Sequence, residues 1–222
     1  MKKILIIAPH PDDEVLGAGG IMRKYAKLGH EVYVLVITKG SPKFYSNEKV
    51  DNVRAEALKA HQILQVKETV FLDYSAPELD ITSKADISNT IFNYLNHWKI
   101  TDLFLPHRGD IHVDHKIVFE AGLVAARPKC DYSVKNIFAY ETLSETEWAP
   151  PFADDAFIPT HFENISKEFE DKIQALSCFK SQMKKFPSIR SLDCVESIAK
   201  YRGATVGFER GEAFMTIRTI KD

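Results

Sequence analysis

The chain has 222 residues, of which 45% are hydrophobic and 27% charged, and its formal net charge is −2. This length and composition are typical of one globular domain, so we expect a single domain over residues 1–222. A charge so close to neutral offers no basic surface for nucleic acid, and no Lys/Arg block marks a polyphosphate or membrane site.

The cysteines and the first residues indicate a reduced, cytoplasmic protein. Cys130, Cys178 and Cys194 are odd in number, widely spaced and without a CxxC pair, which argues against a disulfide framework and a thiolate zinc site. The apolar run after Lys2-Lys3 is too short for a signal peptide. No run approaches the length of a membrane span, so we expect none.

The first apolar run leads directly into a cluster of chemical groups. Ile4–Ala8 predicts a buried strand of a parallel sheet, which ends at Pro9 and Pro11 because proline cannot donate to a sheet ladder. Beside and after these prolines stand one imidazole and three carboxylates: His10, Asp12, Asp13 and Glu14. Ligands of open α/β folds bind just outside the carboxyl ends of strands. The cluster therefore predicts a metal or acid–base site.

The next segment completes a βαβ unit. Val15–Leu28 predicts a helix that covers the sheet and stops at Gly29, and Glu31–Thr38 predicts a second strand. A right-handed crossover makes these strands parallel. The glycines at 17, 19 and 20 do not fit G-x-G-x-x-G, and a pyrophosphate would meet carboxylates there. We therefore predict no dinucleotide site.

A turn-rich loop over residues 39–47 precedes a second helix, which runs to about Leu64 and which Asn47 or Asp51 can cap. Arg54 lies near its start. Two interpretations of Arg54 stay open: a solvated helix charge, or a contact to an anionic or hydroxyl-rich substrate.

The alternation then continues. The pattern predicts a short strand at Thr69–Leu72, a polar loop over Asp73–Thr82, a helix from the cap Ser83 to Trp98, and a fourth strand at Asp102–Leu105, ended by Pro106.

A second cluster follows the fourth strand. Three of the eight histidines lie within the nine residues His107–His115, before an apolar helix over 116–126. His112 and His115 bracket Asp114, at a strand-to-helix turn on the same sheet edge as the first cluster. Two such clusters at one edge predict a functional site rather than satisfied structural histidines.

A smaller helix and strand portion forms the last third. The predicted elements are a strand at Ser133–Glu141, a loop at Thr146–Pro159 that lines or covers the pocket, a short strand at Thr160–Asn164, helices at Ser166–Phe179 and Asp193–Tyr201, and a final strand at Ala213–Thr219.

Together the clusters suit a catalytic metal. Imidazole nitrogen with carboxylate oxygen favours Zn²⁺, although Fe²⁺, Co²⁺ and Mn²⁺ accept the same donors. A catalytic zinc takes three protein ligands and keeps one position for water. The simplest assignment takes His10 and Asp13 from the first turn and His115 from the second. Asp12 then stands beside the bound water as general base, with His112 across from it.

This arrangement predicts a hydrolase for an amide or ester carbonyl. The metal lowers the pKa of its water, Asp12 takes the proton, and the oxyanion is held by the metal and a protonated His112. Asp114 is a candidate to orient His112 and raise the pKa of that imidazole, and Asp110 is the alternative.

At these residues the sequence resembles a known family. Ala8-Pro-His-Pro-Asp-Asp-Glu14, then Gly17-x-Gly19-Gly20 and His112-x-Asp-His115, are similar to the PIG-L/LmbE family of zinc-dependent N-acetylglucosaminyl deacetylases. The similarity is strongest over residues 3–60 and 102–120 and weak over the last third. It implies a Rossmann-like α/β three-layer sandwich with a mostly parallel central sheet. It also implies removal of the N-acetyl group from a GlcNAc-type sugar or conjugate, with release of acetate and a free amine.

Carried over residue by residue, the resemblance implies these metal ligands: His10, Asp13 and His115. Asp12 matches the general base, and His112 matches the histidine that stabilises the oxyanion or protonates the amine. Arg54 matches an arginine that contacts substrate in several members. Asp110, at a position where members differ, is a further candidate for substrate binding.

Two other functions stay open at this point. One is a metal-dependent amidohydrolase acting on a non-sugar conjugate, and the other is a non-catalytic sugar- or nucleotide-binding module. Either way the expected partner is a small molecule, and assembly into a homo-oligomer is left open.

Overall fold

One mixed sheet forms the centre of the protein. The computed structural model describes residues 1–129, 134–150 and 152–221, and seven strands in this part form the sheet. In spatial order they are β3 (Glu68–Ala76), β2 (Glu31–Gly40), β1 (Lys3–Ala8), β4 (Asp102–Pro106), β5 (Asn136–Tyr140), β7 (Gly211–Thr219) and β6 (His161–Asn164). The first five are parallel, whereas β7 pairs antiparallel with both β5 and β6. The predicted, mostly parallel sheet is confirmed.

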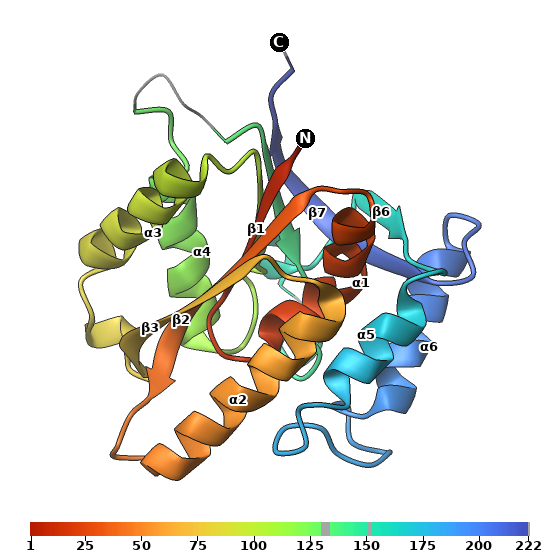
Figure 1. Ribbon diagram of the computed structural model, residues 1–222, viewed down its shortest axis with the longest axis horizontal. Helices are drawn as coiled ribbons and strands as arrows, with labels where there is room; N and C mark the ends of the chain where they lie inside the picture. The colour runs from red at the N-terminus through yellow and green to blue at the C-terminus, as the bar shows by residue number, and fades with distance from the viewer. Residues whose placement is uncertain (130–133, 151, 222) are drawn as a thin grey trace.

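Helices cover both faces of this sheet (Figure 1). On one face lie α1 (Asp13–Lys27), α2 (Asn47–Leu64), α5 (Phe169–Leu176) and α6 (Leu192–Ala204), and on the other α3 (Lys84–Trp98) and α4 (Val113–Ala125). Because side chains alternate along a strand, Ile4 and Ile6 pack into the first core while Leu5 and Ile7 pack into the second. Burial on both faces explains why β1 is continuously apolar. The predicted three-layer sandwich is confirmed.

The site-bearing turns lie where the connections of the sheet diverge. β1 sits between β2 and β4, and the chain leaves β1 into α1 on one face but leaves β4 into α4 on the other. A crevice forms at such a switch point, outside the carboxyl ends of the two strands. The segments His10–Glu14 and His107–His115 meet there.

Several element boundaries differ from those predicted. Ser46 caps α2 instead of Asn47 or Asp51, because its hydroxyl accepts the backbone N–H of Lys49 at 3.3 Å. β3 continues to Ala76, where it still pairs with β2, so the loop predicted from residue 73 begins later and contains a short 3₁₀ helix, η1 (Leu79–Ile81).

Helix α4 begins at Val113, three residues earlier than predicted, which makes His112 its N-cap. In the last third, α5 is shorter than the predicted helix over 166–179 and α6 is longer than that over 193–201. The predicted fifth strand is observed from Asn136, and its expected first residue, Ser133, lies outside the described residues.

A buried ion pair joins the last third to α1. Lys172 of α5 and Glu212 of β7 lie 2.6 Å apart, and both side chains are 4% exposed. The Glu212 carboxylate also accepts the backbone N–H groups of Gly20 and Ile21, each at 2.8 Å. Lys172 also donates to the carbonyl of Leu16 at 2.8 Å. The pair is therefore hydrogen-bonded directly to the backbone of α1.

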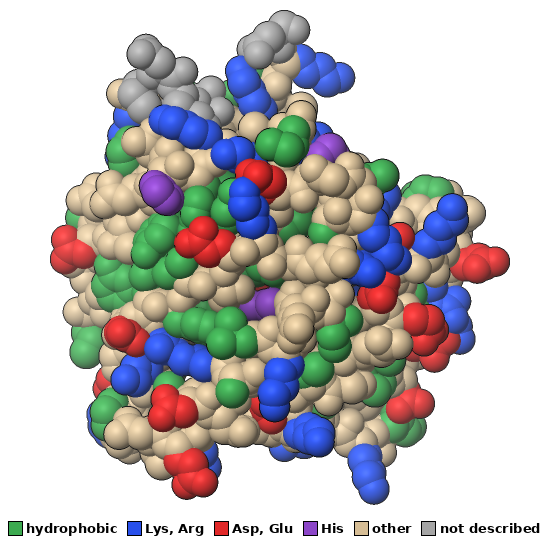
Figure 2. Space-filling model, in the orientation of Figure 1, with side chains coloured by type: hydrophobic (Ala, Val, Ile, Leu, Met, Phe, Trp, Pro, Cys, Tyr) green, Lys and Arg blue, Asp and Glu red, His purple; other side chains and the backbone are tan. Residues whose placement is uncertain are grey.

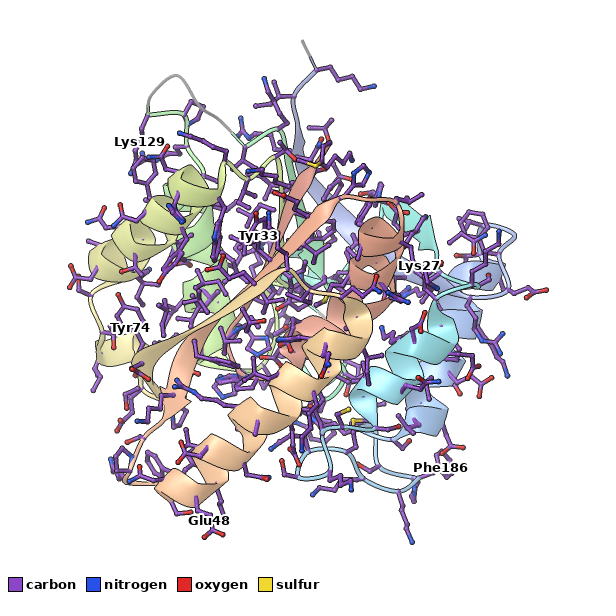
Figure 3. All side chains as sticks on the ribbon, viewed as in Figure 1. Lys27, Tyr33, Glu48, Tyr74, Lys129 and Phe186 are labelled. Carbon is purple, nitrogen blue, oxygen red and sulfur yellow. The ribbon has the colours of Figure 1, made fainter. Side chains whose placement is uncertain are left out.

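Surface pairs reinforce the same contact. Lys27, at the end of α1, lies beside α5 (Figure 3) and bonds Asp171 at 2.8 Å. In β6, Glu163 accepts hydrogen bonds from Lys24 at 2.6 Å and Tyr25 at 2.7 Å. Burial raises the pKa of Glu163, but hydrogen bonds from His161, Lys24 and Tyr25 outweigh this and hold it at about 2.

On the face shown in Figure 2, acidic and basic side chains are interspersed over the helices. No helix within the described ranges is both long and apolar enough to cross a bilayer. Cys178 and Cys194 are free thiols, and Cys130 lies outside the described residues.

Candidate metal centre and active site

The turn after β1 holds its carboxylates in an unusual conformation. Asp12 is the N-cap of α1 but has φ 117°, in the left-handed region, and its side chain makes no cap hydrogen bond. Asp at an N-cap normally accepts a helix N–H, and a non-glycine residue in this conformation carries strain. The side chain instead lines a pocket. A residue that forgoes its local structural role in this way is a functional candidate.

Three of the predicted residues converge. The carboxylate Oδ2 of Asp13 lies 3.1 Å from His10 Nδ1 and 3.3 Å from His115 Nε2. Asp13 and His115 are fully buried, and the donor atoms of the three residues lie within 4.8 Å of one another. The two turns, about a hundred residues apart in sequence, thus form one cluster.

This cluster fits a cation. Although His115 Nε2 is close to Asp13, the angle makes no hydrogen bond, and both His115 Nε2 and Asp13 Oδ1 are buried without a hydrogen-bond partner. Buried polar atoms normally have a hydrogen-bond partner. These two atoms have none, and a metal ion that accepts their lone pairs would satisfy both. An imidazole–carboxylate set of this kind suits a divalent transition metal.

The electrostatics point the same way. Burial lowers the pKa of His115, but Asp13 and Asp110 outweigh it and raise the value to about 10. Burial likewise lowers the pKa of His10, while hydrogen bonds to Asp114 and Asp13 raise it to about 9. For Asp13, burial raises the pKa, yet His115 and His10 hold it well below its usual range. The cluster attracts positive charge strongly, either as protons or as a metal ion.

The carboxylates behind the histidines serve different partners from those predicted. Asp110 bonds His115 Nδ1 at 2.7 Å and accepts the hydroxyl of Thr146 at 2.6 Å. It is not among the residues that line the pocket containing Asp12, and its role in substrate binding stays a prediction. The Asp114 carboxylate bonds His10 Nε2 at 3.1 Å and lies 4.0 Å from His112 Nδ1, beyond hydrogen-bond distance. Each candidate ligand imidazole therefore has its own carboxylate, as metal-binding histidines usually do.

The surroundings of His112 favour the neutral form of its imidazole, whereas the predicted mechanism uses the protonated form. Burial first, then the charges of His10 and His115, lower its pKa to about 4, and Asp114 only partly offsets them. Its Nδ1 accepts the backbone N–H of Asp114 at 3.2 Å, so the proton of the neutral ring is on Nε2.

Comparison with known proteins identifies the family. Residues 5–126, more than half of the chain, match the PIG-L family, described as GlcNAc-PI de-N-acetylase. The chain belongs to the PIG-L family. This family is metal-dependent, in agreement with the cluster of orphaned donors.

Alignments with individual relatives extend the similarity beyond the matched segment, over most of the chain. The uncharacterised deacetylase YaiS of Escherichia coli K12 is 29% identical over 81% of this chain and 91% of its own length. The diacetylchitobiose deacetylase of Thermococcus kodakarensis is 27% identical over 82% of this chain and 70% of its own. The solved 4-carboxy-2-hydroxymuconate hydratase of Pseudomonas putida KT2440 superimposes with a TM-score of 0.80, covering 100% of this chain and 99% of its own, at 18% identity. The last likeness concerns the fold alone, so the reaction must be argued from the site.

One residue that contacts Asp12, Arg190, lies in the last third of the chain, outside the segment that matches the PIG-L family. Arg190 donates to Asp12 Oδ2 at 2.5 Å. Arg190 is not among the predicted site residues, and no local pattern could reveal the contact, because 178 positions separate the two residues. Although burial raises the pKa of Asp12 to about 7, the charge of Arg190 acts to lower it.

Beside the ligand cluster lies a pocket of about 770 Å³. His10, Asp12 and His112 line this pocket, and so does Arg54, whose contact with substrate stays a prediction. Arg54 is also held by the carbonyl of Leu72 at 2.6 Å and by Asp73 at 3.0 Å. The remaining wall carries three lysines and several hydroxyl and amide groups: Lys39, Lys49, Lys184, Asn52, Ser144, Ser181, Ser188 and Gln182. Its volume is that of a site for a small molecule, and it exceeds what one sugar ring fills.

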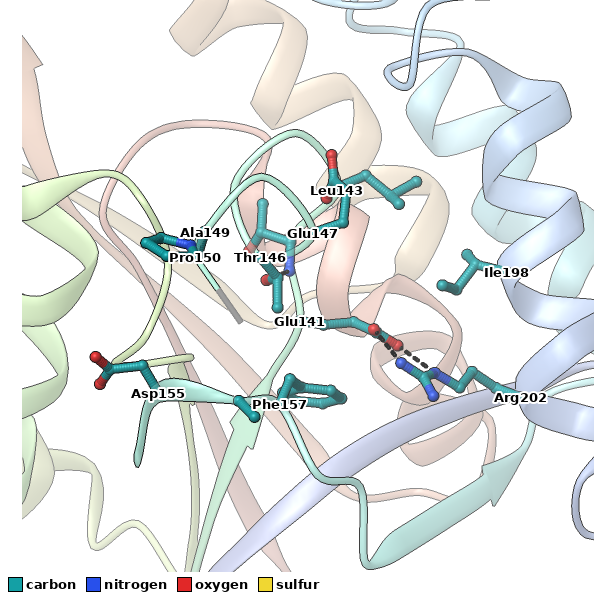
Figure 4. Close-up of a pocket in the computed structure, with 12 residues that line it drawn as sticks. Glu141, Leu143, Thr146, Glu147, Ala149, Pro150, Asp155, Phe157, Ile198 and Arg202 are labelled. Atoms are coloured by element: carbon teal, nitrogen blue, oxygen red, sulfur yellow. Dashed lines mark hydrogen bonds and ion pairs between the residues drawn. The ribbon is translucent and has the colours of Figure 1, made fainter. Parts of the chain in front are cut away.

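The loop predicted at Thr146–Pro159 lines a separate, smaller cavity of about 310 Å³ (Figure 4). Arg202 and Glu141 form a bidentate ion pair on its wall, and Phe157 lies beside them. Part of the loop is the short 3₁₀ helix η2 (Ala153–Asp155). The larger pocket, which contains Asp12, instead takes Ser144 and Glu145 from just before this loop.

Proposed function

We propose that this protein is a metal-dependent N-deacetylase that removes the acetyl group from a GlcNAc-type sugar conjugate, releasing acetate and a free amine. The observation that carries the proposal is the convergence of His10, Asp13 and His115, with two orphaned donor atoms, directly beside Asp12. Membership in a family described as a de-N-acetylase supports the reaction class. A relative named as a diacetylchitobiose deacetylase supports the sugar substrate.

In this proposal His10, Asp13 and His115 hold the metal, and Zn²⁺ is its first candidate because this mixed set of nitrogen and oxygen donors suits zinc best. When bound, the metal supplies a Lewis acid that polarises the acetyl carbonyl and acidifies a water molecule. Asp110 and Asp114 keep the two imidazoles in place through their second nitrogens.

The other residues handle protons and charge. Asp12 accepts the proton of the attacking water, since its carboxylate faces the pocket next to the ligand cluster. The Nε2–H of neutral His112 donates a hydrogen bond to the carbonyl oxygen as negative charge develops there. Asp12 then returns its proton to the amine nitrogen, so that the leaving group departs neutral. Arg54 and the polar outer wall bind the rest of the conjugate.

The test is acetate release by the purified, zinc-loaded protein from N-acetylglucosamine, N,N′-diacetylchitobiose and a set of N-acetyl amino acids. We expect release from the sugars. Activity confined to non-sugar amides would replace the proposal by the amidohydrolase alternative. Absence of both turnover and stoichiometric metal would favour a non-catalytic binding module.

Asp12→Asn is the matched variant for the mechanism. An amide cannot take up the proton of water, so we expect turnover to fall by about 10²- to 10⁴-fold while the metal content stays at the wild-type value. A turnover within about tenfold of wild type would remove Asp12 from the role of base. His115→Ala should instead lose the metal, and full metal occupancy in that variant would contradict the ligand set.

A further inference from the structure

Arg190 connects three segments that meet over Asp12. Its Nη1 donates to Asp12 Oδ2 at 2.5 Å, its Nε donates to Ser144 Oγ at 2.7 Å, and its Nη2 lies 3.5 Å from Glu145 Oε1. All three nitrogens of the guanidinium thus face a partner, an arrangement that the planar fork of arginine allows and the single ammonium group of lysine does not. Only 20% of its side chain is exposed.

Two of these partners are strained. Asp12 and Ser144 have φ 117° and 81°, and they are two of the four non-glycine residues with positive φ within the described ranges. A strained backbone conformation persists only where surrounding contacts hold it in place, and such residues are concentrated at functional sites. One arginine side chain bonds both residues, across the two loops that follow β1 and β5.

The backbone of Arg190 is itself firmly held. The adjacent Ser191 caps α6 by accepting the N–H of Cys194, and the carbonyl of Arg190 accepts the N–H of Lys184 at 2.8 Å. A cation just before a helix N-terminus is disfavoured by the helix dipole, so helix stability does not explain an arginine at this place. Its contacts are to the active site.

We propose that Arg190 is a positioning residue for the Asp12 carboxylate. The guanidinium holds Oδ2, and among the described residues no group donates a hydrogen bond to Oδ1, which is therefore the oxygen that accepts the proton of water. The last third of the chain thereby completes a catalytic group that belongs to the first turn. The inference rests on the proposed function, in which Asp12 is the base.

The experiment compares Arg190→Met, Arg190→Lys and Arg202→Met in the full-length, zinc-loaded protein, with N,N′-diacetylchitobiose as the probe. Arg202 is the matched control, since it makes a bidentate ion pair with Glu141 from the same part of the fold but does not touch Asp12. We expect Arg190→Met to lower kcat by roughly 10- to 100-fold, because a displacement of about 1 Å of a reacting group costs about that much. KM should change by less than about threefold and zinc content should not change, because Asp12 is neither the metal ligand nor the main substrate contact.

The control variants separate positioning from general stability. Arg190→Lys should recover part of kcat, because it keeps the charge but not the fork, and Arg202→Met should stay within about twofold of wild type. An unchanged kcat in Arg190→Met, a parallel loss of zinc, or an equal loss in Arg202→Met would each overturn the proposal.

A second readout does not depend on turnover. In a crystal structure of Arg190→Met, the Asp12 carboxylate should occupy a different position from that in the wild type, and an unmoved carboxylate would refute the positioning role. If the wild-type protein released no acetate from any sugar, the proposed function would fail, and this comparison would still decide whether Arg190 fixes Asp12.

Discussion

Asp110→Asn tests whether the carboxylate that bonds His115 strengthens metal binding at the proposed site. Asp110 accepts the Nδ1–H of the fully buried His115 at 2.7 Å, and its second oxygen accepts the hydroxyl of Thr146 at 2.6 Å. Asparagine has the same shape, and its amide oxygen can still face His115 while its NH₂ group faces the hydroxyl oxygen. The variant therefore removes the charge and leaves the volume unchanged.

The charge matters because it raises the basicity of a ligand imidazole and fixes its tautomer. Loss of such a carboxylate weakens metal affinity by about 10- to 100-fold, or roughly 1.4 to 2.7 kcal/mol, which is the size expected when a charge-assisted hydrogen bond becomes a neutral one. The assay is a zinc competition titration against a chromophoric chelator.

Asp102→Asn is the control, since Asp102 is a buried carboxylate at the opposite end of β4, bonded to Lys2 and Asn136. It should leave the zinc Kd unchanged. A Kd for Asp110→Asn within about twofold of wild type would refute the reasoning, and so would an equal loss in the control.

Three further predictions concern protons, packing and acid stability. Because pKa values of about 9 and 10 keep His10 and His115 protonated at pH 7 without metal, zinc binding should release about two protons and tighten as pH rises, which calorimetry in buffers of different ionisation enthalpy measures; no proton release would contradict the assignment. Gly17→Ala places a Cβ 2.2 Å from a ring carbon of the buried Tyr140, so it should cost about 2–3 kcal/mol and lower Tm by roughly 5–10 °C; an unchanged melting curve would show that the ring yields freely. The depressed pKa of Glu163 stabilises the fold above pH 4.5, and this contribution is lost as pH falls toward 2. Glu163→Gln should therefore lower the unfolding free energy by about 1–3 kcal/mol at pH 7, with a difference that shrinks between pH 4.5 and 2, and urea denaturation at several pH values should reveal it.

Much of the fold was predictable because its signals are local. The apolar run of β1 reflects burial on both faces, and the helices keep their apolar periodicity, so most elements were found within a few residues of their ends. The convergence of the two clusters followed from one geometric fact, that parallel strands end at a common edge of the sheet.

The pairing within the site could not be read from spacing. Asp110 and Asp114 both lie within five positions of His115, yet the first turn of α4 directs Asp114 toward His10 in the other loop and leaves Asp110 to His115. The lowered pKa of His112 also depends on tertiary structure, because it results from burial and from two neighbouring imidazoles. Arg190 reaches the site only through the folded arrangement of α5, the following loop and α6. In that loop the labelled Phe186 points to solvent (Figure 3), and only the end of the segment turns inward.

The hydrogen bonds of the Lys172–Glu212 pair to the backbone of α1 bear on where this chain can be cut. A fragment that ended at residue 126, the limit of the family match, would remove the carboxylate that accepts the amides of Gly20 and Ile21, in the helix that begins at Asp13. Deleting only one charge of the pair should cost about 3–5 kcal/mol, since its partner would stay buried and uncompensated. We therefore expect recombinant halves to be inactive separately and to regain activity only when they reassociate.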